Sequence, residues 1–405
     1  MSWDLHRLED ICDVINGGSW SQEEYISEGV KVIKVSNLIN DGIDESNMSF
    51  LPIESLSVYE KNILKSYDLV VTTVGSHPQL KASAAGRGFI ISPVYEGALL
   101  NQNSVCIRTK NDKILYNRFL GYIGRSDDFR HYIQQTGRGA ANQMRIPISN
   151  IKSFELSLPP LQTQKRIASI LSAYDDLIEN NLKRIKLLEE TAQNIYKEWF
   201  VNFRFPNYEN TPINQETGLP EGWVKVNLYD FAEVKMGFPF KADDFNEANI
   251  GKPAIRIRDI PNNWTKTYTT QEVSEDYTVE QGDILIGMDG FFYLEIWGGQ
   301  KGYLVQRVCR LRSFQKELQG FLIEALREPI KYYEKTISGA TVAHLGAKHL
   351  KEIFITVPKG VLIIEQLGVF NKIANQKITL LNQNQKLKEA RDILLPRLMN
   401  RTIEV

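Results

Sequence analysis

Residues 167–199 read IASILSAYDDLIENNLKRIKLLEETAQNIYKEW, and this stretch determines how the chain is organised. Apolar side chains recur in it at alternating steps of four and three residues, which is the a/d seam of a coiled-coil helix with Asn181 as its polar member. A second seam runs from Ile373 to Leu394, with Gln383 in the position of Asn181. One buried polar residue per seam fixes register and partner number, so two paired helices are predicted rather than two long core helices. The predicted pairing positions are Leu171, Ile178, Asn181, Ile185, Ile373, Leu380, Gln383, Leu387 and Leu394.

Each helix follows a globular stretch, and the two stretches are copies of one unit. Trp3 and Trp223 are 220 residues apart, and this offset falls to 199 at the ends of the copies because loop lengths differ. The aligned segments are residues 8–17 with 228–237, 32–38 with 254–260, 68–75 with 283–290, 99–106 with 303–309 after a slip of one residue, and 151–159 with 350–358. These segments have the patterns of strands, and short helices are expected between them.

The predicted fold class is therefore α+β, with two tandem similar domains that are each followed by a long helix. A linker rich in Pro, Gly and Asn separates the two halves. The predicted boundaries are residues 1–159 and 223–358 for the domains, 160–205 and 359–405 for the helices, and 206–222 for the linker.

The composition excludes several classes of protein. The formal net charge is −1, from 48 Lys and Arg against 49 Asp and Glu, so a nucleic-acid reader would need its positive charge on one face. Cys12, Cys106 and Cys309 lie far apart without CxxC spacing, which predicts buried, reduced thiols rather than a disulfide framework or a zinc site. Neither a signal segment nor a run of about 18 apolar residues is found, so we expect a soluble cytoplasmic protein without a membrane partner.

No motif for catalysis stands out. The sequence Leu158-Pro159-Pro160-Leu161 lacks the polar and aromatic ends of an amino-methyltransferase motif and is typical of a helix entry. Residues 137–142 miss the GxGxxG pattern, and no GxxxxGK[ST] loop occurs, so neither a dinucleotide nor ATP is expected. Residues 233–235 offer only a weak nuclease pattern, without a convincing metal-binding aspartate.

The order of globular unit, helix, globular unit, helix resembles that of type I restriction specificity subunits, over essentially the whole chain. The most specific segments of this resemblance are residues 158–161 with Gln164, Ile167 and Leu171, and residues 197–206, 219–223, 282–290 and 391–399. Together these segments are a strong signal, whereas each alone would be weak.

The resemblance implies a non-catalytic subunit with two target-recognition domains, each reading half of a split site in double-stranded DNA. It also implies that the two helices form an antiparallel coiled coil, which sets the gap between the half-sites and docks two methyltransferase subunits. Motor-nuclease subunits would join the assembled enzyme. No cofactor is expected in this chain, since S-adenosylmethionine, ATP and Mg would belong to the partner subunits.

Side chains that read bases are expected in the loops between strands, where Arg, Lys, Asn, Gln, Ser and Thr can offer hydrogen-bond donors. The first-domain candidates are Ser19, Trp20, Ser76, His77, Lys81, Arg87, Arg138, Asn142, Gln143 and Arg145. The second-domain candidates are Lys235, Phe238, Lys241, Asp289, Tyr293, Arg307, His344 and Lys348. The two sets differ, which predicts an asymmetric target. Arg256 and Arg258 lie on a predicted strand, where pairing with Asp259 or Asp283 is at least as plausible as a DNA contact.

Two rival interpretations stay open at the level of sequence. The specificity component of a fused restriction-methylation enzyme shares this architecture and differs only in its partner. A coiled-coil scaffold without a DNA role would also have long helices, but it leaves unexplained why the loops diverge while the framework repeats.

Overall fold

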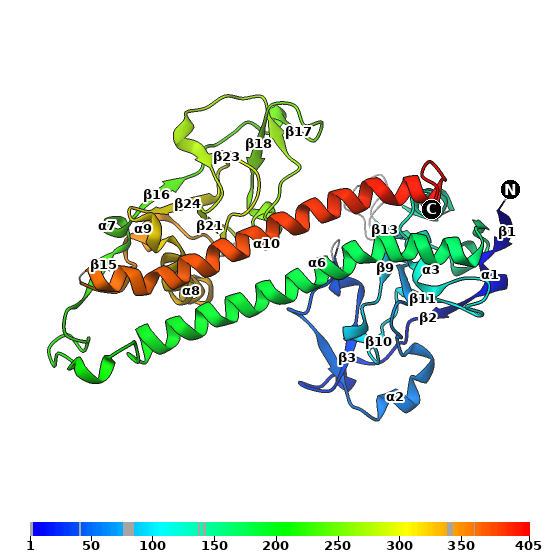
Figure 1. The fold of residues 1–405 in the computed structure, drawn as a ribbon, viewed down its shortest axis with the longest axis horizontal. Helices are drawn as coiled ribbons and strands as arrows, with labels where there is room; N and C mark the ends of the chain where they lie inside the picture. Colours follow the sequence, from blue (N-terminus) through cyan, green and yellow to red (C-terminus); the bar gives the residue numbers. More distant parts are fainter. Residues whose placement is uncertain are drawn as a thin grey trace. The chain divides into compact units, whose positions relative to one another are not determined.

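The computed structural model describes residues 3–39, 42–75, 85–136, 138–140, 143–337, 343–359 and 361–405, with the backbone alone at 138–140, 143 and 361–365. The chain folds into two compact units, drawn in Figure 1. The first contains Met1–Asp175 and Glu389–Val405, and the second contains Asp176–Lys388. Each unit therefore includes part of both long helices, α6 (Leu161–Tyr196) and α10 (Val361–Met399).

The first unit contains short helices and several small sheets. Its helices are α1 (Leu8–Ile11), α2 (Ser55–Val58), α3 (Asn117–Ile123), α4 (Asp127–Thr136) and α5 (Ile148–Lys152). Its strands are β1 (Asp4–Arg7), β2 (Cys12–Asn16), β3 (Val30–Ile33), β4 (Leu38–Ile39), β5 (Gly42–Ile43), β6 (Ser49–Leu51), β7 (Leu69–Thr72), β8 (Val74–Gly75), β9 (Gly88–Ile90), β10 (Leu99–Leu100), β11 (Ser104–Thr109), β12 (Arg138–Ala140), β13 (Gln143–Arg145) and β14 (Glu155–Leu158).

The second unit has the same succession of main strands with fewer helices. Its helices are α7 (Leu228–Phe231), α8 (Gln319–Thr336) and α9 (Ala347–Lys351). Its strands are β15 (Trp223–Asn227), β16 (Ala232–Met236), β17 (Phe245–Asn246), β18 (Lys252–Ile255), β19 (Tyr268–Thr269), β20 (Thr278–Val279), β21 (Ile284–Gly287), β22 (Leu294–Ile296), β23 (Gly302–Leu304), β24 (Val308–Ser313) and β25 (Phe354–Pro358).

Two sheets of the first unit have counterparts with the same strand order in the second unit. The antiparallel sheet β2-β11-β7-β9 corresponds to β16-β24-β21-β22, and the pair β1-β14 corresponds to β15-β25. In each unit one pair of strands is parallel, β10 with β3 and β23 with β18. The central strands β7 and β21 are fully buried, which explains why they are apolar except for Thr72 and Gly287 at their ends. The α+β class and the two similar domains are thus confirmed.

A buried ion pair recurs at the same place in both units. Asp68 receives hydrogen bonds from Nε and Nη2 of Arg108, and Asp283 receives the same two bonds from Arg312. The side chains of Asp68 and Asp283 are 0% and 6% exposed, so each arginine compensates a carboxylate that burial would otherwise destabilise. Asp283 is therefore the partner of Arg312, and not of Arg256 or Arg258.

The strand pairings correct one part of the sequence alignment. The hydrogen bonds that match Arg108 with Arg312 make Cys106 equivalent to Arg310, whereas the sequence alignment had matched it with Cys309. The slip of one residue therefore does not occur before β11. All three cysteines are buried as predicted, and burial raises the pKa of the Cys309 thiol to about 12.

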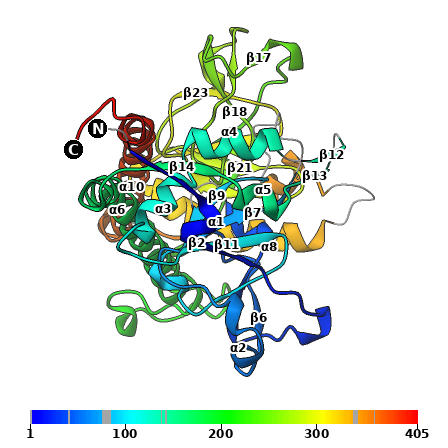
Figure 2. The same cartoon turned by 90° about the vertical axis from the view of Figure 1, so that its right-hand side faces the viewer.

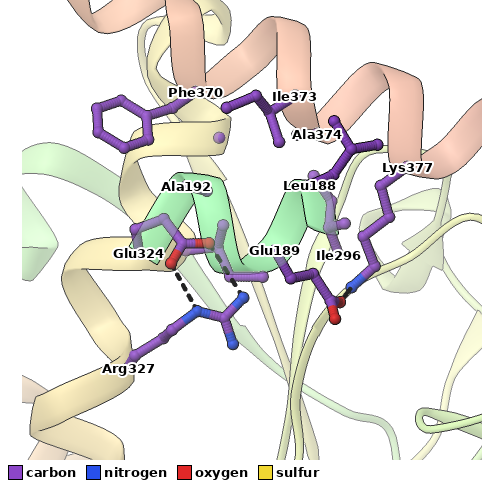
Figure 3. A pocket seen from close by; sticks show the side chains of 12 residues that line it. Leu188, Glu189, Ala192, Ile296, Glu324, Arg327, Phe370, Ile373, Ala374 and Lys377 are labelled. Atoms are coloured by element: carbon purple, nitrogen blue, oxygen red, sulfur yellow. Dashed lines mark hydrogen bonds and ion pairs between the residues drawn. The ribbon is translucent and has the colours of Figure 1, made fainter. Parts of the chain in front are cut away.

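The helices α6 and α10 run antiparallel and are joined in the second unit by buried polar groups. Nδ2 of Asn181 donates to Oδ1 of Asn384 at 2.9 Å. Nζ of Lys377, whose side chain is 8% exposed, lies 2.5 Å from Glu189 of α6 and 2.6 Å from Glu295 of β22. Figure 3 shows Lys377 reaching from α10 towards Glu189. Later residues of α6 thus face earlier residues of α10, as an antiparallel pair requires.

In the first unit the same two helices are joined by Asp175. Its carboxylate lies 2.7 Å from Nη1 of Arg391 on α10 and 3.1 Å from Nη1 of Arg125, and it accepts a hydrogen bond from the Tyr122 hydroxyl at 2.7 Å. Burial alone would raise the pKa of Asp175, but the two arginines and the tyrosine hold it below its usual value. The carboxylate therefore stays charged and ties both helices to the globular part of the unit.

The polar layer at the centre of the helix pair differs from the prediction. Asn384 is buried opposite Asn181, whereas Gln383 is exposed, so the assignment of Gln383 was wrong by one residue. The predicted apolar pairing positions Leu171, Ile178, Ile185 and Leu380 are buried, and Ile373, Leu387 and Leu394 are half-buried. Lys377, Asn384 and Arg391 follow one another at intervals of seven residues, so they occupy one heptad position. A slip of one heptad would leave these groups without their partners, and the polar layers therefore fix the register.

We predict that Asn181→Leu alone lowers the free energy of unfolding by about 1–3 kcal/mol, because it leaves the buried Oδ1 of Asn384 without its donor. Adding Asn384→Leu should restore or exceed the original stability, since an apolar pair needs no hydrogen bond. Urea unfolding measures both effects, with the exposed Gln383→Leu as control. Equal stability of the single and double variants would contradict the pairing.

A second repeated feature lies after β3 and β18. The backbone N–H of Lys34 donates to Asn37 Oδ1 at 3.0 Å, and that of Arg256 donates to Asp259 Oδ2 at 2.9 Å. The Arg256 side chain donates to the Thr267 hydroxyl, so its role in the structure is internal. Burial raises the pKa of Asp259 to about 7, whereas the neutral Asn37 carries no such cost.

Because the folded pKa of Asp259 lies above its ordinary value of 3.8, the folded state binds this proton more tightly than the unfolded state does. The contribution of Asp259 to stability should therefore fall as pH rises from about 4 to about 7 and then level off. Asp259→Asn should match the wild type near pH 4 and exceed it by about 2–4 kcal/mol at pH 8. Urea unfolding across this range tests the prediction, with the exposed Asp243→Asn as control. Parallel curves for Asp259→Asn and the wild type would refute it.

Candidate nucleic-acid interface

The turn before β11 and the turn before β24 have the same construction. In the first unit, Gly17 N–H donates to Ser104 O at 2.9 Å and Thr73 N–H donates to Asn103 O at 2.8 Å. The equivalent bonds in the second unit run from Gly237 to Val308 and from Met288 to Arg307, both at 2.9 Å. A Cβ at Gly17 or Gly237 would lie 2.0 Å from a backbone oxygen, so both positions require glycine.

Asn103 and Arg307 are the equivalent residues at these two turns. Both have a φ of 71°, in the left-handed region that side chains other than glycine rarely adopt. Both are exposed. The repeated frame therefore presents a different side chain at the same point in each unit.

In the second unit the structure brings together Arg307, Asp289 and His344. Nη1 of Arg307 lies 2.9 Å from Asp289 Oδ2, and Nδ1 of His344 lies 2.6 Å from Asp289 Oδ1. The side chains of Arg307 and His344 are 56% and 50% exposed. Among the described residues Nε and Nη2 of Arg307 have no partner, so these donors can meet acceptors of a ligand.

Strand β21 and the segment before α9 position this cluster. Asp289 lies two residues after the end of β21 and forms a β-bridge with His344, and Leu345 N–H donates to Met288 O at 2.8 Å. Beyond Asp289 the chain exposes Phe291 and Tyr293, whose rings are 6.0 Å apart. Arginine, histidine and aromatic side chains on one loop region are suited to contact bases and phosphates.

The corresponding region of the first unit is a small sheet. Strand β13 pairs with β8. Strand β12 pairs with β13, and Figure 2 shows these two strands side by side. Ile146 N–H donates to Thr73 O at 2.8 Å, which makes Arg145 equivalent to His344 and Val74 equivalent to Asp289. Arg145 is exposed, and its backbone pairs with that of Arg138. In both units the segment that pairs with the residues after the central strand, β7 or β21, thus carries a basic or imidazole side chain, Arg145 or His344.

The other candidates of the first unit have varied surroundings. Ser19 is exposed and donates to Gln102 Oε1 at 3.4 Å, and Arg87 is half-buried, with its pKa lowered by burial. Trp20 packs edge-on against Tyr59, with ring centroids 5.1 Å apart, and belongs to an apolar cluster. Trp20 therefore has a structural role that the sequence did not indicate. Arg138 and Gln143 lie on strands whose side chains are not described, and Ser76, His77, Lys81 and Asn142 lie outside the described residues.

In the second unit several candidates are involved in internal contacts. Lys235 lies 4.4 Å from the centre of the Tyr277 ring and 3.9 Å from the Asp276 carboxylate. Phe238 packs against Tyr277 and Phe240. Lys241, Tyr293 and Lys348 are exposed. The cluster around Arg307 is thus better placed for a ligand than Lys235 or Phe238.

Sequence reasoning missed Asn103 as an equivalent of Arg307. The signal was present, because Leu100 and Leu304 keep the same offset as Asn103 and Arg307, but the slip of one residue in the sequence alignment hid this equivalence.

Within the part of the chain that the structure describes, no group of acidic, His and Cys side chains could hold a metal ion, and no helix is long and apolar enough to cross a membrane.

A model of the type I restriction modification DNA specificity domain matches residues 2–190 and 220–390. The EcoBI specificity subunit of Escherichia coli is 32% identical over 191 residues, which are 47% of this chain and 38% of that subunit. The MjaIX specificity subunit of Methanocaldococcus jannaschii is 23% identical over 98% of this chain and 92% of its own. The crystal structure of a type I S subunit from M. genitalium superposes with a TM-score of 0.56 at 18% identity, covering 98% of this chain and 96% of that one, and so has the same fold.

We predict that Trp20→Ala lowers the free energy of unfolding by about 2–4 kcal/mol, because it removes the ring that packs against Tyr59. Trp20→Phe should cost less, since it keeps part of that contact. Urea unfolding measures both variants. Unchanged stability combined with weaker DNA binding would instead assign Trp20 to the DNA interface.

Proposed function

Because this chain belongs to the family of type I restriction-modification DNA specificity subunits, which are non-catalytic, we propose that each of its two units reads one half of an asymmetric, two-part site in double-stranded DNA. The observation that carries the proposal is the pair of turns at Asn103 and Arg307. One backbone frame occurs twice and presents different side chains, which is what two unlike half-sites require.

The helix pair would act as the spacer between the half-sites. A helix of 36 residues such as α6 is about 54 Å long at 1.5 Å per residue, and the buried polar layers hold it in one register against α10. One register gives the spacer one length, which supports a fixed gap between the bases that are read.

The outer face of α6 offers a surface for partner subunits. Leu187, which the helical spacing places away from the seam, is 61% exposed, and Leu177 and Leu182, which flank the seam on its two sides, are 47% and 41% exposed. We assign this face to two methyltransferase subunits, which would supply S-adenosylmethionine. Motor-nuclease subunits, with ATP and Mg, would join that assembly in the cytoplasm.

The test is genome-wide detection of methyladenine in cells that express this chain with its neighbouring methyltransferase. We expect one asymmetric motif in two parts, present with the chain and lost when the chain is deleted. Re-expression of the wild-type chain is the control and should restore the motif. Methylation that is unchanged by the deletion would refute the proposal for that methyltransferase.

A further inference from the structure

The backbone at residues 103 and 307 points to a function for the side chains there. A φ of 71° strains a side chain such as that of arginine, whereas glycine adopts it freely and asparagine adopts it more readily than other residues. Both units place an exposed polar side chain rather than glycine at this position. Arginine gains nothing from this backbone conformation, so the strain retained at Arg307 indicates that its side chain itself is needed.

Arg307 is prepared for directional hydrogen bonding. Asp289 binds its Nη1 at 2.9 Å, which orients the guanidinium and leaves Nε and Nη2 without a partner among the described residues. The carboxylate also cancels the charge of the arginine, so the pair gains little from a phosphate. The acceptors O6 and N7 of guanine match two parallel N–H donors in the major groove.

The surroundings of Asn103 suit an uncharged side chain that contacts a base. Its amide has no partner within the described part of the chain, and the position of Asp289 is taken by Val74, which is equivalent by strand pairing. An amide needs no carboxylate to offset its charge. A carboxamide offers one donor and one acceptor side by side, which matches N7 and the amino group of adenine.

We propose that residues 103 and 307 are equivalent base-reading positions, where Arg307 selects a guanine in one half-site and Asn103 selects an adenine in the other. The inference rests on the proposed function, and it adds the bases and the residues that read them. Asp289 is the positioning residue for Arg307.

The test uses the full chain with its methyltransferase and reads the methylated motif across the genome. We use Arg307→Gly, because glycine adopts the φ of this turn without strain and the exposed side chain is not needed for packing. The preference for guanine at one position of one half-site should fall by about 5-fold to 150-fold, with the other half-site unchanged. Arg307→Lys should also lose the preference for guanine, since a single ammonium cannot make the paired hydrogen bonds.

Asn103→Gly should relax an adenine in the other half-site in the same way. The matched control is Lys301→Gly, which removes an exposed cation of the same unit that pairs with Glu280 at 2.8 Å, and it should leave the motif unchanged. Binding of the complex to DNA at several salt concentrations gives a second readout. The salt dependence should not change in Arg307→Gly combined with Asp289→Asn, which removes both charges of the pair, whereas loss of a phosphate contact would reduce the slope by about one.

The outcomes separate the two proposals. A motif that depends on the chain but is unchanged in Arg307→Gly and Asn103→Gly overturns the base-reading assignment and leaves the specificity function intact. A uniform loss of methylation with a reduced salt slope also overturns it, because it assigns Arg307 to the DNA backbone. If no motif depends on the wild-type chain, the proposed function itself fails.

Discussion

The structure depends on the charged and amide groups that are buried between α6 and α10. Lys377 carries a charge although its side chain is 8% exposed, and burial alone would lower its pKa. Glu295 and Glu189 reverse this effect and raise the pKa, so the ammonium is stable only where both carboxylates can reach it. An apolar seam is equally well satisfied after a slip of seven residues, whereas these groups are satisfied in one register. Since Glu295 belongs to a strand and Asp175 binds Tyr122 and Arg125, the same polar groups also tie the globular parts to the helices.

Periodicity and repetition in the sequence predicted the two helices, the α+β class and the equivalence of the main strands. The errors arose where polar residues occupy inward positions or where a remote partner decides the position of a side chain. The inward face of α10 carries Lys377, Asn384 and Arg391 at intervals of seven residues, and these polar residues hid the seam, so Gln383 was assigned in place of its neighbour Asn384. Arg310 and Lys377 are buried because their partners come from distant segments, and no local pattern indicates such partners. For the candidate site, Arg307, Asp289 and His344 were predicted as separate loop residues, and only strand pairing brought them together.

The internal ion pairs also explain how a nucleic-acid reader can have a net charge near zero. Several cations of this chain form internal ion pairs that stabilise the fold, and they add little positive charge to the surface. Arg108 pairs in this way with Asp68, and Arg312 pairs with Asp283. Lys34 and Arg256 lie over the aromatic rings of Tyr25 and Phe245, at the same place in each unit. The net charge of −1 therefore says little about the charge available at one loop region, because the balance includes groups that compensate one another inside the protein.

The pairing of Arg307 with Asp289 extends this argument from stability to recognition. An unpaired arginine binds any phosphate, and the affinity it contributes is the same at every sequence. A carboxylate beside it removes most of that general attraction while it leaves the remaining N–H donors in a fixed direction. The interaction that survives depends on acceptors in the right geometry, which the edge of a base provides and a phosphate reached from another angle does not. A protein whose task is to distinguish sites gains more from such a neutral, oriented pair than from an additional free charge, because specificity is a difference between affinities.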